Sequence, residues 1–177
     1  MEMTDSRSIA APPEVVWAAL LDADVLKAAV PGCEEMSGSA DEGFEAVVVQ
    51  KVGPVKARFT GKVTLSEMVE PESLVLTGEG KGGAAGFAKG GARVRLEPAE
   101  GGTLLSYEVE AKVGGKLAQL GSRIIDGFAR KMADEFFNRF QAAVEGPSTE
   151  AEPGEDDSGE DGPRKAGWFK RMIGKGG

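Results

Sequence analysis

The sequence contains no histidine and a single cysteine, Cys33, among its 177 residues. Without histidine, the usual general base at neutral pH, the serine–histidine nucleophile pair and the commonest metal ligand are all missing. One thiol provides neither a thiolate zinc site nor an intramolecular disulfide, and the lack of disulfides suits a reducing compartment. We therefore predict a cytoplasmic protein that is not an enzyme, with no catalytic residues and no metal site.

Long apolar runs and excess positive charge are also lacking. No stretch approaches the roughly 20 apolar residues of a membrane-spanning helix, and the first residues lack the features of a secretory signal. The net charge of −8 argues against nucleic acid, because binding phosphates requires a basic surface. Hydrophobic residues make up 41% of the chain, which is enough for one domain with a core, predicted at residues 1–146.

The central part of the sequence alternates between apolar and polar residues, as half-buried β-strands do. Strands are predicted on this basis at residues 44–52, 55–65, 74–80, 92–97 and 105–113. Turns rich in glycine, proline and acidic residues separate them, which is typical of an antiparallel meander. Before them, residues 2–10 are predicted to form a strand, and residues 13–21 and 22–30 two short helices.

Residues 116–144 are predicted to form one long helix, because apolar residues recur there at steps of three or four. The apolar stripe consists of Leu117, Leu120, Ile124, Phe128, Met132, Phe136, Phe140 and Val144. Gly146 and Pro147 provide a stop signal after it. The order of elements predicts an α+β fold in which an antiparallel sheet curves around the C-terminal helix.

The inward positions of the predicted strands hold many small residues, among them Gly61, Gly78, Gly80 and Ala111. Small residues beneath a helix leave room, so we predict an apolar cavity for a hydrophobic ligand. The predicted lining consists of Ala57, Phe59, Gly61, Leu76, Gly78, Phe87, Ala92, Tyr107, Val109, Leu120, Ile124, Phe128 and Met132. In the alternative interpretation, Phe128, Met132 and Phe136 fill this space themselves.

The glycine-rich segment 78–83 has the spacing of a dinucleotide-binding fingerprint. That site requires a helix to begin directly after the glycines, whereas an alternating strand follows here. We therefore predict a hairpin around residues 82–91 that forms a lip of the cavity. Phe87 at its tip is either a gate for the ligand or a small contact point.

The last thirty residues differ from the rest. Residues 147–163 are acidic and rich in proline, glycine and serine, which predicts a disordered linker. Residues 164–177 are basic and amphipathic, which predicts a tail that binds an anionic membrane surface. The membrane-binding residues would be Arg164, Lys165, Trp168, Phe169, Lys170, Arg171, Met172 and Ile173. The alternatives are a solubilising end or a helix that docks in a protein groove.

Five blocks of the sequence resemble one known family. They are residues 11–17 (APPEVVW), 30–34 (VPGCE), 53–59 (GPVKARF), 86–90 (GFAKG) and 113–123 (VGGKLAQLGSR). The chain is similar there to the carbon monoxide dehydrogenase CoxG family, which is part of the START-like (SRPBCC) helix-grip superfamily. The resemblance implies a sheet that grips a long C-terminal helix around a cavity, in agreement with the order of elements above.

The resemblance also implies a function and partners. Family members are accessory proteins of molybdenum-containing carbon monoxide dehydrogenases and related hydroxylases, and they are associated with holding the enzyme at the membrane. A quinone, either menaquinone or ubiquinone, is the implied ligand, and peripheral attachment to the inner face of the cell membrane is the implied location. The alternatives are a recruitment adaptor without a ligand, and an enzyme or carrier for another hydrophobic small molecule. Arg58 and Arg123, within the matching blocks, would bind a quinone carbonyl, meet an acidic partner or be surface charges.

Overall fold

The structure of the protein, a computed structural model, describes residues 1–146. The predicted linker (147–163) and the predicted membrane-binding tail (164–177) lie outside the described residues. The strands are β1 (Glu2–Ile9), β2 (Cys33–Ser39), β3 (Gly43–Val52), β4 (Val55–Val69), β5 (Ser73–Lys81), β6 (Phe87–Ala99) and β7 (Gly102–Gly114). The helices are α1 (Pro13–Leu20), α2 (Ala23–Ala29), the 3₁₀ turn η1 (Gly83–Ala85), α3 (Lys116–Gln119) and α4 (Ser122–Glu145).

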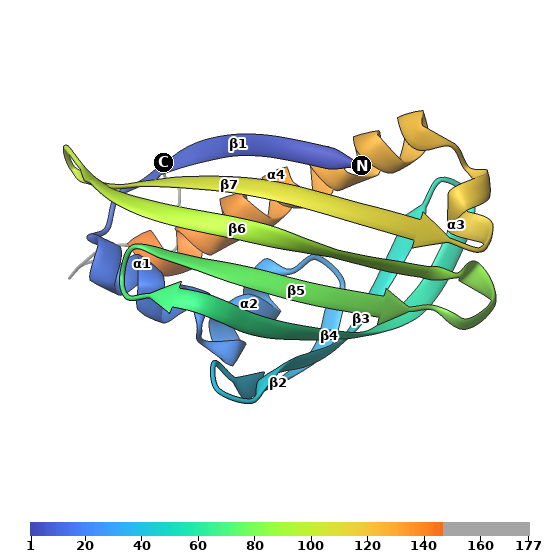
Figure 1. Cartoon of the computed structure of the whole chain (residues 1–177), viewed down its shortest axis with the longest axis horizontal. Helices are drawn as coiled ribbons and strands as arrows, with labels where there is room; N and C mark the ends of the chain where they lie inside the picture. Colours follow the sequence, from blue (N-terminus) through green and yellow to red (C-terminus); the bar gives the residue numbers. More distant parts are fainter. Residues whose placement is uncertain (147–177) are drawn as a thin grey trace, which may run out of the picture. The chain divides into compact units, whose positions relative to one another are not determined.

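All seven strands form one antiparallel sheet in the order β1-β7-β6-β5-β4-β3-β2. Strands β2 to β7 pair in chain order through short hairpins, and β1 adds to the free edge of β7. Figure 1 shows that α1, α2 and α4 all lie on one face of this sheet, which we call the inner face. The structure thus confirms the α+β class and the sheet with a long C-terminal helix that the sequence predicts.

The two short helices have local start signals of different kinds. Pro13 lies in the first turn of α1, where its missing N–H is not needed. Asp22 caps α2, because its carboxylate accepts hydrogen bonds from the backbone N–H groups of Asp24 and Val25. Both helices therefore begin within a residue of the predicted positions.

The C-terminal helix differs from the prediction, since it is broken into two parts. A short helix, α3, ends at Gln119, and α4 begins at Ser122. Between them Gly121 has a φ of +89°, in the left-handed region that glycine enters at little cost. The apolar spacing continues through Gly121 without interruption, so the spacing alone did not predict the break.

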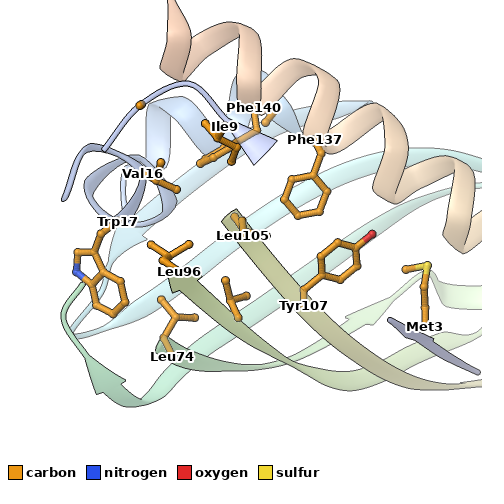
Figure 2. Close-up of a cluster of buried hydrophobic side chains, with 13 residues drawn as sticks. Met3, Ile9, Val16, Trp17, Leu74, Leu96, Leu105, Tyr107, Phe137 and Phe140 are labelled. Atoms are coloured by element: carbon orange, nitrogen blue, oxygen red, sulfur yellow. The ribbon is translucent and has the colours of Figure 1, made fainter. Parts of the chain in front are cut away.

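The tightly packed core lies at one end of the inner face. Leu105, Phe140 and Val16 are completely buried there, and Trp17 of α1 closes the end. Figure 2 shows these side chains between the sheet, α1 and the C-terminal half of α4. Three phenylalanines of α4 pack against one another, with the rings of Phe136 and Phe137 5.0 Å apart. This cluster holds the C-terminal half of α4 on the sheet.

Candidate functional site

The inner face beyond the core is where the sequence predicts ligand-lining residues. In an antiparallel pair, directly opposite residues share a face. Buried Leu74, Val94 and Tyr107 form one row across β5, β6 and β7 and define the inner face. The same register places the other predicted strand residues on this face, namely Ala57, Phe59, Gly61, Leu76, Gly78, Ala92 and Val109.

Burial falls sharply beyond the row of Leu74, Val94 and Tyr107. Those three side chains are 2%, 6% and 4% exposed, respectively. In the next row, Leu76, Ala92 and Val109 are only half-buried. Phe59, Phe128 and Met132 are half-buried as well, although all three are large and apolar. Apolar side chains in a filled core are fully buried, so this half of the inner face is incompletely covered.

Two of the helical residues of the predicted lining, Leu120 and Ile124, lie at the far end of this uncovered half. A Cβ added to Gly53, in the turn between β3 and β4, would be 3.5 Å from Ile124 and 3.8 Å from Leu120. These two side chains therefore lie against that turn, and Ile124 is still 40% exposed. The arrangement brings the predicted strand residues other than Phe87, together with Leu120 and Ile124, to one apolar face, while an enclosed cavity among them stays a prediction.

The hairpin predicted as a lip is shorter than expected. Strand β6 begins at Phe87, so the turn covers only residues 82–86. Its 3₁₀ turn contacts β4 and α3, and Ala85 of the turn and Leu117 of α3 are both buried. Gly82 lies against the ring of Phe59. The turn thus closes over one end of the inner face.

Phe87 is the one predicted lining residue that the structure places elsewhere. It pairs with Gly114 and Lys81, and these positions alternate with the inner ones. Its side chain therefore lies on the outer face, over Gly114, and is 42% exposed. The prediction treated Phe87 as part of a loop, whereas the strand already includes it and fixes its face by the two-residue period.

Sequence reasoning missed a polar cluster that joins β1 to α4. Arg7 lies on the inner face, opposite Leu105. Its guanidinium donates hydrogen bonds to Asp134 Oδ1 at 3.0 Å, to Asn138 Oδ1 at 3.1 Å and to Gln141 Oε1 at 3.4 Å. It also lies 5.6 Å from the centre of the Phe137 ring, a cation–π distance. The sequence signal that could have found Arg7 was the two-residue alternation along residues 2–9, which places Arg7 on the same face as Met3 and Ile9.

Tyr107 lies beside this cluster. Its ring stacks on Phe137 with centroids 4.9 Å apart. Burial raises the pKa of the phenol, and the nearby Asp5 carboxylate raises it further, while Arg7 opposes the shift. The hydroxyl therefore stays protonated at neutral pH. Among residues 1–146, no group accepts a hydrogen bond from it or donates one to it.

The outer face carries a separate trough of about 650 Å³ across β4 to β7, with several charged side chains in its lining. Lys62, Glu79, Lys89 and Lys112 lie in one row along it. Of the predicted lining residues it includes only Gly78, so it is not the apolar site that the sequence predicts.

The two arginines considered as carbonyl donors are both on the surface. Arg58 is an outward residue of β4 that forms an exposed ion pair with Glu34 of β2. Arg123 is exposed in the first turn of α4. Their positions favour the interpretation as surface charges.

Two further findings concern only residues 1–146. No three acidic or cysteine side chains there are grouped as metal ligands would be. None of the helices in this part of the chain has the length and apolar character that crossing a bilayer requires.

The sheet order, the two short helices and the long C-terminal helix make up a START-like fold. A similar crystal structure is that of a conserved protein from Geobacillus kaustophilus, with 26% identity, a TM-score of 0.75, and coverage of 81% of this chain and 95% of that one. A Thermus thermophilus protein has 17% identity and a TM-score of 0.65, covering 84% of this chain and all of that one. A START superfamily protein from Mycobacterium smegmatis has 14% identity and a TM-score of 0.61, covering 81% and 97%.

The sequence profile of the carbon monoxide dehydrogenase G-subunit family (CoxG) matches residues 6–145. The chain therefore belongs to the CoxG family, as its five sequence blocks predict. No curated protein matches the chain significantly.

Proposed function

We propose that this protein is a non-enzymatic accessory protein that binds an apolar ligand on its inner face and serves a molybdenum-containing carbon monoxide dehydrogenase or a related hydroxylase. The observation that carries the ligand part is the uncovered half of the inner face, where large apolar side chains such as Phe59 and Phe128 remain half-buried. A bound apolar molecule would remove this surface from water, which stabilises the complex by roughly 25 cal/mol per Å². Membership in the family supports the enzyme partner.

The proposed ligand is a quinone, either menaquinone or ubiquinone. Its ring and isoprenoid tail are apolar, and Phe59, Leu76 and Val109 present a matching apolar surface. Such a ligand would carry electrons from the soluble enzyme to the respiratory chain.

The proposed location is the inner face of the cell membrane, reached through residues 164–177. Each basic residue near an anionic surface contributes about 1 kcal/mol, and each fully buried apolar side chain of the tail adds roughly 1.5–3 kcal/mol. Ordering the tail opposes these terms, so binding should be reversible and sensitive to salt.

The ligand proposal is tested by native mass spectrometry of the full chain purified from its own host. A bound quinone supports the carrier, and another lipid or hydrophobic molecule would redirect the proposal to a different ligand. Repeated absence of any bound molecule would support an adaptor that recruits the enzyme without carrying anything.

The membrane proposal is tested by flotation with anionic liposomes. The full chain should float at low salt and a truncation after residue 146 should not. Equal flotation of the two would overturn the assignment of residues 164–177 as the membrane-binding segment.

A further inference from the structure

Two buried hydroxyl groups lie on the inner face of β7, four residues apart. Thr103 is 1% exposed, and its hydroxyl donates a hydrogen bond of 2.7 Å to the backbone carbonyl of Ala11. Tyr107 is 4% exposed, and within residues 1–146 its hydroxyl has no such partner. A buried polar group without a partner destabilises the fold, so such groups are rare unless something else satisfies them.

The position of Tyr107 indicates where that partner would come from. Along β7, the inner residues Thr103, Leu105 and Tyr107 are buried, and Val109 is the first that is only half-buried. Tyr107 is thus the last residue of the packed core before the uncovered half. Figure 2 shows its hydroxyl oxygen directed toward α4 and away from Leu105.

The orientation of the ring is fixed by stacking on α4. Phe137 stacks on it at an interplanar angle of 23°. Phe137 is held in turn by Arg7, whose guanidinium is bonded to Asp134 and lies against the same ring. The hydroxyl is therefore pre-positioned where the packed core meets the uncovered half of the inner face.

We propose that the Tyr107 hydroxyl donates a hydrogen bond to a carbonyl oxygen of the bound ligand and so selects ligands that carry a ketone or quinone group at one end. This inference rests on the proposed ligand-binding function. The remainder of the ligand extends from Tyr107 over Val109 and Ala92 toward the turn between β3 and β4. The phenol acts as the donor because it stays protonated at neutral pH, as its raised pKa requires.

The test compares two probes that share one carbon skeleton, of which only one carries carbonyl groups. Menadione and 2-methylnaphthalene have the same fused rings and methyl group, but only menadione carries carbonyl groups. Their affinities for the full chain are measured by ligand-observed NMR titration. The wild-type protein should bind menadione more tightly than 2-methylnaphthalene.

Tyr107→Phe keeps the stacked ring and removes only the hydroxyl. It should weaken menadione binding about fivefold to tenfold, the value of one neutral hydrogen bond, and leave 2-methylnaphthalene unchanged. The matched control is Thr103→Val, which removes the other buried hydroxyl from the same face of β7. It should bind both probes as the wild type does.

A second measurement follows the bond itself. The carbonyl stretching frequency of bound menadione should be lowered in the wild type and in Thr103→Val, and should return upward in Tyr107→Phe. An equal frequency in all three proteins would overturn the proposal.

The outcomes also separate this inference from the proposed function. If 2-methylnaphthalene and menadione bind the wild type equally, or Tyr107→Phe weakens both, the carrier function stands and the role of Tyr107 is wrong. If the wild type binds neither probe, the ligand-binding function and this inference both fail.

Discussion

Arg7 and Asp134 form an ion pair of 3.0 Å that joins the first strand of the chain to its last helix. Within residues 1–146, this pair differs from the other ion pairs because Arg7 is only 21% exposed, while Asp134 is 62% exposed. Arg7 also packs on the ring of Phe137 and bonds two further side chains of α4. The contact therefore combines charge, hydrogen bonding and packing, and an isolated ion pair on the surface does not have all three.

Replacing Arg7 with methionine should destabilise the protein by about 1–2 kcal/mol, because α4 loses its hydrogen bonds and a cation–π contact to β1. Urea unfolding measures this change. The matched control is Arg58→Met, which removes a pair with Glu34 in which the side chains are 61% and 44% exposed. It should change stability by less than about 0.5 kcal/mol. Equal effects of the two substitutions would contradict the special role of Arg7.

Removing either of the two buried hydroxyls of β7 should affect stability differently. Thr103→Val should cost about 1–3 kcal/mol, because the carbonyl of Ala11 loses its buried donor. Tyr107→Phe, measured without ligand, should cost nothing or raise stability slightly, because it removes a buried group with no partner among residues 1–146. Thermal unfolding of both variants checks the prediction. A loss for Tyr107→Phe as large as that for Thr103→Val would mean that the phenol is already satisfied.

Two glycines near the start of α4 provide a test of the helix break. A Cβ at Gly121 or at Gly127 would meet nothing within 4 Å among the described residues, so an added methyl group is free of steric crowding at both positions. Gly127 is helical, and Gly127→Ala should stabilise by up to about 1 kcal/mol. Gly121 has a φ of +89°, so Gly121→Ala should destabilise by roughly 1–2 kcal/mol. If both stabilise, residues 116–144 form the continuous helix that the sequence predicts.

Filling the uncovered half should block the ligand without harming the fold. Gly80 lies on the inner face opposite Gly61, and an added Cβ there would be 3.9 Å from the carbonyl oxygen of Thr60, an ordinary contact. Gly80→Leu should therefore reduce menadione affinity more than about tenfold while the melting temperature stays equal or rises. Gly80→Ala, which adds one methyl group, is the control and should bind nearly as the wild type does. Retained binding in Gly80→Leu would place the ligand elsewhere.

Local patterns in the sequence were sufficient for most of the fold. The two-residue alternation of Leu105 and Tyr107 with Ser106 assigned the faces of β7 correctly, because strand geometry forces successive side chains to opposite sides. Pro13 and Asp22 marked the starts of α1 and α2 through groups that satisfy the helix termini locally. The small inner residues, such as Gly61 and Gly78, were also identified, and with them the face on which a ligand is proposed.

The tertiary structure alone decided the features that depend on distant partners. Gly121 breaks the helix because its backbone adopts a left-handed φ, and the spacing of apolar residues contains no information about that angle. Phe87 lies outside because its register is set by pairing with Gly114, and Arg7 bonds Asp134 across 127 positions of the chain. The Tyr107 hydroxyl lacks a partner among residues 1–146 for the same kind of reason, since only the packed chain shows which buried groups have found partners within reach.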